Sequence, residues 1–125
     1  MTYLDTHVVA WLDGGRLDLL TDPVRRVLRD DELVISPMVR LELQFLYEIG
    51  RVATPAGAVV AELARAIGLT LCPQSFAAVI ERAEAQAWTR DPFDRIIVAQ
   101  AALRRSRLVT KDETIRAQYR HAVWS

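Results

Sequence analysis

Four acidic residues occupy positions at which a carboxylate either is costly or could carry out chemistry. Asp5 and Asp112 come at the ends of two predicted buried strands, and Glu42 and Asp94 fall on largely apolar faces of two predicted helices. In an open parallel α/β sheet, ligands bind at the carboxyl ends of the strands. Because a buried and unpaired carboxylate costs several kcal/mol or more, each inward-facing acid needs a partner.

Glu42 is the clearest of the four. On a helical wheel drawn at roughly 100° per residue, it falls near the middle of an arc of apolar residues, which are Met38, Val39, Leu41, Leu43, Phe45, Leu46 and Ile49. This carboxylate could instead form a buried ion pair with an arginine, or the helix could be turned so that Glu42 reaches an edge of the core.

For the other three acids, helix capping is the simpler role when each is taken alone. Asp94 is the third helical residue after a predicted cap at Asp91, where a carboxylate satisfies backbone donors and the helix dipole. Taken together, the four acids could converge on one pocket, and their mutual repulsion there would require a cation. Oxygen-only ligation favours Mg²⁺ or Mn²⁺ over zinc, and such a site suits the hydrolysis of phosphodiesters.

Further sequence features exclude several classes of function. The chain has no phosphate-binding or dinucleotide-binding glycine loop, no HExxH motif and no GxSxG motif. One cysteine, Cys72, and two histidines, His7 and His121, are too few for a zinc site. The 16 basic and 16 acidic residues give a net charge of zero, which excludes a strongly basic nucleic-acid scaffold but not a local basic stripe.

The composition is that of a single globular domain over residues 1–125, because 51% of the residues are hydrophobic and 26% are charged. No apolar run approaches the roughly 20 residues that span a bilayer. The first residues also lack the basic region of a secretory signal. We therefore expect a cytoplasmic protein.

Short apolar runs alternate with helical segments along the chain. Strands are predicted at Tyr3–Leu4, Leu33–Ile35, Leu69–Cys72, Arg107–Thr110 and Ala122–Trp124. A capping residue followed by proline at 22–23, 36–37, 54–55 and 91–92 predicts the starts of four helices. Because the strands show no polar alternation, we expect an α/β fold with a mainly parallel sheet of four or five strands, covered on both faces by helices.

Four segments, in this order, resemble PIN-domain proteins. They are Tyr3-Leu4-Asp5-Thr6-His7, the segment 36–42 that ends in Glu42, the segment 90–101, and Leu108-Val109-Thr110-Lys111-Asp112. Within that family, the D-P-F-D-R-x-x-x-A-Q-A run that begins at Asp91 is similar to the VapC-type toxins of bacterial toxin–antitoxin pairs. The resemblance extends along the whole chain, and the four motifs are more specific together than singly.

This resemblance implies a three-layer α/β/α fold and a metal-dependent ribonuclease that acts on RNA. It also implies a homodimer, and a cognate antitoxin whose tail lies across the active-site groove. The family's catalytic and metal-binding acids fall on Asp5, Glu42, Asp94 and Asp112. The family's residues that support the active site correspond to Thr6, Asp91 and Thr110.

The substrate-binding and partner-binding surfaces are less sharply marked. Arg95 adjoins Asp94, and Arg104 belongs to a group of arginines near the C-terminus, so these two are the first candidates for contacts with RNA phosphates. The apolar helices between Pro37 and Ile67 are candidates for a dimer or antitoxin interface. Trp11 is expected to be an anchor in the core or at an interface.

Two further functions compete with the nuclease. A receiver-type signalling domain has a similar length and sheet, and a lysine after a late strand, here Lys111. It also requires a phosphoacceptor aspartate near mid-chain, and residues 51–61 contain none. A non-catalytic binding module with the same acidic pocket remains the second hypothesis, which a test for metal-dependent cleavage of RNA would distinguish.

Overall fold

A five-stranded, all-parallel sheet organises the chain in the computed structural model, which describes all 125 residues. The strand order is β3-β2-β1-β4-β5, and every neighbouring pair is parallel. The strands are β1 (Thr2–Leu4), β2 (Leu33–Ile35), β3 (Thr70–Leu71), β4 (Arg107–Val109) and β5 (Ala122–Val123). The three central strands are almost fully buried, as expected for a sheet covered on both faces.

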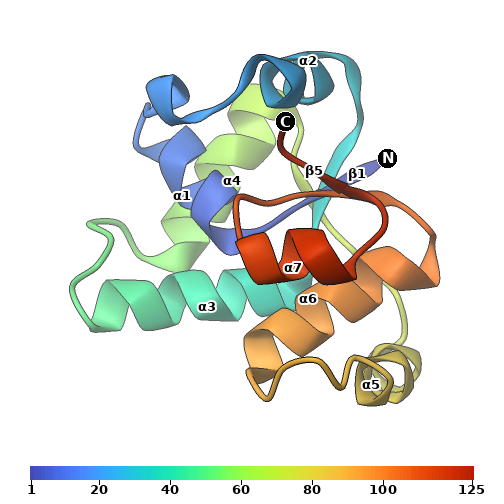
Figure 1. The fold of residues 1–125 in the computed structure, drawn as a ribbon. Coiled ribbons are helices and arrows are strands. Elements are labelled where there is room, and N and C mark those ends of the chain that lie inside the picture. The colour runs from blue at the N-terminus through green and yellow to red at the C-terminus, as the bar shows by residue number, and fades with distance from the viewer.

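Seven α-helices and one short 3₁₀ turn connect and cover the strands. They are α1 (Thr6–Asp13), η1 (Leu17–Leu19), α2 (Asp22–Asp30), α3 (Pro37–Glu48), α4 (Ala56–Ile67), α5 (Phe76–Glu84), α6 (Pro92–Leu103) and α7 (Glu113–Gln118). Figure 1 shows α1 and α4 grouped on one side of the strands and α6 and α7 on the other. The predicted α/β architecture with helices on both faces is therefore confirmed.

The five predicted strands are all present, but two of the predicted helix caps are wrong. Helix α2 is capped by Thr21 rather than Asp22, and the Thr21 hydroxyl accepts the backbone N–H of Val24. Helix α4 begins after Pro55, without a capping bond from Thr54. In both places the chain enters the helix one residue away from the predicted position.

The central pair of strands brings the ends of two distant segments together. Tyr3 is in register with Leu108 and Leu4 with Val109, so the residues that follow the two strands emerge side by side. The N–H of Asp5 continues the ladder by donating to the carbonyl of Val109 at 2.9 Å. Residues more than a hundred positions apart in the sequence thus lie together at the carboxyl ends of β1 and β4.

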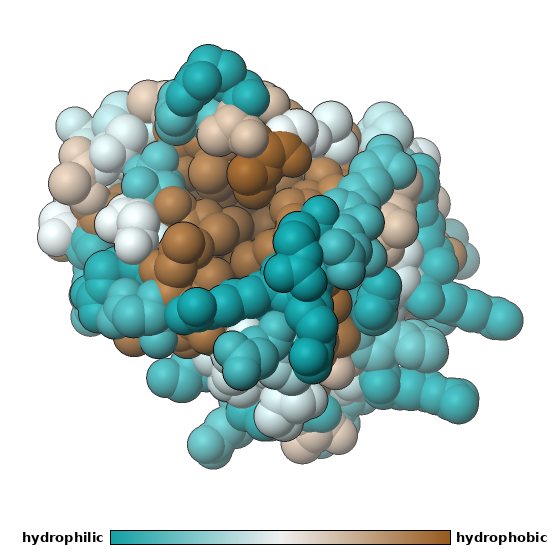
Figure 2. Space-filling view, turned by 90° about the horizontal axis from the view of Figure 1, so that it is seen from above, coloured by the Kyte–Doolittle hydropathy of each residue, from teal (hydrophilic) through white to brown (hydrophobic).

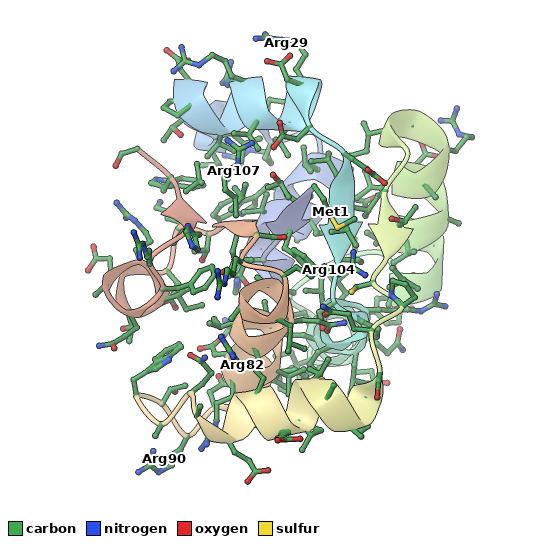
Figure 3. The ribbon with its side chains drawn as sticks, turned by 90° about the vertical axis from the view of Figure 1, so that its right-hand side faces the viewer. Met1, Arg29, Arg82, Arg90, Arg104 and Arg107 are labelled. Atoms are coloured by element: carbon green, nitrogen blue, oxygen red, sulfur yellow. The ribbon has the colours of Figure 1, made fainter.

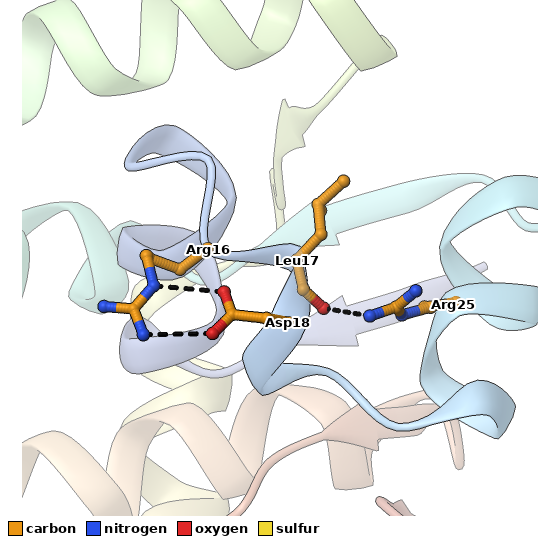
Figure 4. A network of polar contacts seen from close by, with 4 residues as sticks. All are labelled: Arg16, Leu17, Asp18 and Arg25. Atoms are coloured by element: carbon orange, nitrogen blue, oxygen red, sulfur yellow. Dashed lines mark hydrogen bonds and ion pairs between the residues drawn. The ribbon is translucent and has the colours of Figure 1, made fainter.

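A polar network holds the turn between α1 and α2 in place. Arg16 donates two hydrogen bonds to the Asp18 carboxylate, at 3.0 and 3.1 Å, and Arg25 of α2 donates to the carbonyl of Leu17 at 2.6 Å (Figure 4). The Arg16–Asp18 pair is exposed, so it contributes little to stability. Arg25, by contrast, joins α2 to the 3₁₀ turn through the carbonyl of Leu17.

The main core contains 27 buried residues drawn from strands and helices on both sides of the sheet. In the view from above, apolar side chains gather in a hollow that hydrophilic side chains surround (Figure 2).

None of the helices has the length and apolar character needed to cross a membrane.

Candidate active site

Asp5 is the most rigidly held of the candidate acids. It ends β1 and caps α1, and one of its carboxylate oxygens accepts the N–H of Thr6 at 2.8 Å. The Thr110 hydroxyl donates to the other oxygen at 2.6 Å. Only 7% of the residue is exposed. Burial raises the pKa of Asp5, and the hydrogen bonds from Thr110 and Thr6 oppose that rise only in part.

Thr110 links the two central strand ends. Its hydroxyl donates to Asp5 and accepts the backbone N–H of Asp112 at 3.1 Å. Asp112 in turn caps α7, where its side chain accepts the N–H of Ile115 at 2.9 Å. Because one buried hydroxyl serves both segments, the positions of these two aspartates are coupled.

Glu42 lies at the boundary of the buried face of α3 rather than at its middle. The buried positions of this helix are Val39, Leu43 and Leu46, while three other members of the predicted apolar arc are about half exposed: Leu41, Phe45 and Ile49. The sequence-based placement of Glu42 at the centre of a core-facing arc is therefore wrong, because about half of that arc faces solvent. No arginine pairs with Glu42.

The partner of Glu42 is the hydroxyl of Thr6, which donates to one carboxylate oxygen. Partial burial raises the pKa of Glu42, the Thr6 hydrogen bond lowers it, and the charge of Asp5 raises it again. Thr6 therefore connects α1 to α3 next to Asp5, as Thr110 connects Asp5 to the segment that follows β4.

Asp91 and Asp94 come from the first turn of α6. Asp91 is the predicted helix cap, and it accepts the N–H groups of Phe93 at 2.8 Å and Asp94 at 3.3 Å. The Asp94 side chain accepts no hydrogen bond from the protein, so both of its carboxylate oxygens are available. Burial and, next, the charge of Asp91 raise the pKa of Asp94 to about 7, with smaller contributions from the other pocket acids.

All five carboxylates line one pocket of about 420 Å³, which we call the acidic pocket. Its lining consists of Asp5, His7, Trp11, Glu42, Asp91, Asp94, Lys111 and Asp112. The structure thus brings together the four acids predicted to be catalytic, with Asp91 beside them. Thr6 and Thr110 hydrogen-bond to pocket acids, as supporting residues would.

Sequence reasoning missed two members of the pocket, Trp11 and Lys111. Lys111 is the only lysine of the chain, and its Nζ lies 6.0 Å from the centre of the Trp11 ring. The signals were present: Lys111 stands between Thr110 and Asp112, and Trp11 lies one helical turn after His7. A cation and an aromatic ring therefore stand beside the carboxylates.

The two arginines predicted to contact RNA lie outside the acidic pocket. Arg95 donates to the carbonyls of Ala83 and Glu84, at 3.2 and 3.1 Å, and so ties α6 to the end of α5. Arg104 follows the opposite end of α6 and reaches the sulfur of Met1. RNA contact by either side chain stays a prediction.

The arrangement of motifs and fold matches one protein family. A family model for the PIN domain covers residues 2–120. The chain belongs to the PIN domain family. Among curated proteins, this PIN domain is similar to Ribonuclease VapC22 of Mycobacterium tuberculosis, with 32% identity over an alignment of 123 positions, which covers 94% of this chain and 91% of the relative.

Two solved structures share the fold of this PIN domain. One is a toxin–antitoxin complex from Klebsiella pneumoniae, with a TM-score of 0.67, 20% identity, and coverage of 98% of this chain and 96% of the other. The second is VapBC2 from Rickettsia felis bound to a DNA fragment from their promoter, with a TM-score of 0.67, 15% identity, and coverage of 100% and 98%. At these identities, the two structures inform the fold alone.

The donors in the pocket of this PIN domain fit a hard divalent cation. They are carboxylate oxygens, and the pKa values of Asp5, Glu42 and Asp94 are all raised, because burial and mutual repulsion disfavour their charged forms. A cation would relieve that repulsion. No three of the chain's acidic, histidine or cysteine side chains form a ready-made metal cage, so an ion would have to draw the carboxylates closer than they stand here.

Proposed function

We propose that this PIN domain is an Mg²⁺- or Mn²⁺-dependent endoribonuclease that acts in the cytoplasm as the toxin of a toxin–antitoxin pair. The observation that carries the proposal is the convergence of five carboxylates from four parts of the chain on one pocket. The similarity to a curated ribonuclease of the VapC type supports RNA as the substrate.

Asp5, Glu42, Asp94 and Asp112 would hold the divalent ion, with Asp91 beside them. A bound ion of this kind polarises a phosphate and lowers the pKa of a nearby water. The chain's own part is to fix the carboxylates: Asp5 through two hydrogen bonds and Glu42 through the Thr6 hydroxyl. Lys111 also lines this pocket, and its ammonium would contact a phosphate oxygen of the substrate.

The direct test is RNA cleavage by the purified protein, freed of any partner, with bulk tRNA as the substrate. We expect cleavage with Mg²⁺ or Mn²⁺ and none with EDTA. Asp5→Asn and Glu42→Gln should keep the fold but abolish both cleavage and growth arrest on expression. Glu48→Gln, on the exposed side of the same helix, is the matched control and should behave as the wild type.

Two outcomes would change the proposal. Cleavage retained by Asp5→Asn or Glu42→Gln at an equal soluble level would remove that residue from the site. A wild-type protein that cuts no RNA under any of these conditions would favour a non-catalytic binding module with the same acidic pocket.

We propose a homodimer through the exposed side of α3. Leu41, Phe45 and Ile49 are 55%, 46% and 51% exposed and follow one another at four-residue spacing, so they form an apolar stripe. The stripe continues into a groove of about 480 Å³ lined mainly by apolar side chains from α3, α5 and α6, in which Phe76 is 72% exposed. A second copy could cover both surfaces.

We propose that an antitoxin covers a different groove, which runs alongside the acidic pocket. This groove, of about 480 Å³, lies between α1, the end of α3 and residues 51–54, and it shares His7 and Trp11 with the acidic pocket. A partner segment in it would block access to the carboxylates. The test is a small protein encoded beside this gene: it should form a stable complex with the chain and stop cleavage.

A further inference from the structure

A second polar pocket lies at the far end of α6 and has the opposite charge. It measures about 640 Å³ and is lined by Arg82 of α5, by Ala102 and Arg105 at the end of α6, and by Tyr119, Arg120 and His121 after α7. Three guanidinium groups and an imidazole therefore meet without any carboxylate. We call this site the basic pocket.

The three arginines of the basic pocket have no partner within the protein. Four other arginines form ion pairs: Arg16, Arg29, Arg65 and Arg107. No ion pair and no hydrogen bond engages the side chain of Arg82, Arg105 or Arg120. In a chain of zero net charge, this is a local concentration of unpaired cations that a bound anion would neutralise.

The end of α6 accounts for only part of this cluster. A helix C-terminus favours positive charge, which explains Arg105, placed just after α6 in the left-handed region at φ 50°. It does not explain Arg82, which comes from another helix, or Arg120, which follows α7. Figure 3 shows Arg82, Arg104 and Arg107 on the side of the molecule at which α6 is seen end-on.

The aromatic residues of the basic pocket are fixed in position. The Tyr119 hydroxyl donates to the carbonyl of Ser106 at 2.6 Å, and its ring meets that of His121 edge to face, with the ring centres 5.7 Å apart. The segment that carries Arg120 is therefore held against the end of α6. The three arginine side chains are exposed, and the backbone segments that carry Arg105 and Arg120 are held together beneath them.

We propose that the basic pocket binds backbone phosphates of the RNA substrate, away from the bond that is cut. Guanidinium groups recognise phosphate with paired hydrogen bonds, and they do so without regard to base sequence. This inference rests on the proposed ribonuclease function, because it assigns a second contact to the same substrate.

The geometry of α6 sets the length of RNA that reaches both pockets. Asp94 begins the helix and Arg105 follows its end, so at about 1.5 Å per residue the two pockets lie about 16 Å apart along the axis. Residues Ile97–Ala102 of α6 are buried, so the RNA must pass over the neighbouring surface. At about 3.4 Å per nucleotide of a stacked strand, the axial distance therefore sets a minimum of about five nucleotides. A shorter RNA could occupy the acidic pocket but could not reach the arginines.

The test compares two triple variants that remove the same charge. Arg82→Gln/Arg105→Gln/Arg120→Gln removes the basic pocket, and Arg26→Gln/Arg40→Gln/Arg65→Gln removes exposed arginines of α2, α3 and α4. Binding is measured in EDTA, so that nothing is cleaved, with fluorescein-labelled single-stranded RNAs of about 24 and about 4 nucleotides over a series of salt concentrations.

For the longer RNA, the basic-pocket variant should lose at least about tenfold in affinity, and the slope of log K against log salt should fall by about 2. The control variant should lose less than about threefold, and the shorter RNA should bind equally to all three proteins. Equal losses in the two variants, or no loss in either, would overturn the proposal.

Three further measurements distinguish RNA binding from the binding of another ligand and from a failure of the variant to fold. If inorganic phosphate raises the wild-type melting temperature while RNA binding is unchanged by the variant, the pocket serves free phosphate and the proposal is wrong. If only duplex DNA or a co-purifying antitoxin loses affinity, it is also wrong. Should the triple variant fail to fold, Arg82→Gln/Arg120→Gln must show the same selective loss for the longer RNA.

This binding measurement is independent of catalysis. A selective loss of RNA binding by a protein whose wild type never cleaves RNA would support the basic pocket while overturning the ribonuclease. Cleavage by a wild type whose RNA binding is insensitive to the arginines would do the reverse.

Discussion

Removing the charge of Asp94 should stabilise the protein in EDTA at high pH. The pKa of Asp94 is raised from 3.8 to about 7 by burial and by the neighbouring carboxylates. Because the folded state holds this proton more tightly than the unfolded state does, ionisation of Asp94 destabilises the fold. The free energy of unfolding of the wild type should therefore fall as pH rises from about 4 to above about 7. Asp94→Asn removes that loss.

The size of the effect follows from the surroundings of Asp94. A shift of this size would be worth about 4 kcal/mol for a fully buried group, but Asp94 is only partly buried, and screening by solvent reduces the effect to about 1 to 2 kcal/mol. Losing the favourable charge in the first turn of α6 offsets about 0.5 kcal/mol of the gain. A net gain of about 1 kcal/mol corresponds to a rise in melting temperature of about 4 °C for a chain of this length.

Calorimetry in EDTA at about pH 4 and about pH 8.5 would measure this difference. Asp94→Asn should melt above the wild type only at the higher pH. Asp22→Asn, in the first turn of α2 and remote from the pocket, is the matched control and should melt slightly below the wild type there. A lower melting temperature for both variants at high pH would show that the carboxylates do not repel one another as inferred.

Three other changes test the scaffold and the dimer. Thr110→Val should lower the free energy of unfolding by about 2 kcal/mol, because it leaves a buried carboxylate oxygen of Asp5 unpaired. Urea unfolding measures this loss, with Thr114→Val, at an exposed position, as the control. Equal unfolding midpoints for the two variants would contradict the prediction. Gly68→Ala should cost about 1 kcal/mol, since Gly68 ends α4 at φ 70°, and an unchanged melting temperature would count against this account. Phe45→Glu should convert the dimer to a monomer in sedimentation velocity, and a wild type that is already monomeric would remove the dimer proposal.

The sequence was sufficient for features that depend on neighbouring residues. The Asp91-Pro92 pair predicts both the start of α6 and the capping role of Asp91, and the buried run Leu33–Ile35 predicts β2. Each of these features follows from backbone geometry or burial within a few residues, so no knowledge of the remaining chain is needed.

Features that depend on distant contacts were less accessible. The helical wheel of α3 identifies an apolar arc but not which part of that arc faces the core. It cannot distinguish a buried residue such as Val39 from an exposed one such as Phe45. The partner of Glu42 is Thr6, which lies 36 residues away and on another helix. Similarly, nothing local places Lys111 over the ring of Trp11.

Three of the five pocket acids, Asp5, Asp91 and Asp112, also cap helices. A gene copy that drifts after losing its enzymatic role would still be selected for folding at these three positions, where alanine costs about 1 kcal/mol per cap. Aspartate, asparagine or serine should therefore persist there in silenced copies. Glu42 and Asp94 do not cap helices. Substitution at these two positions is therefore the better indicator that a related protein has lost nuclease activity.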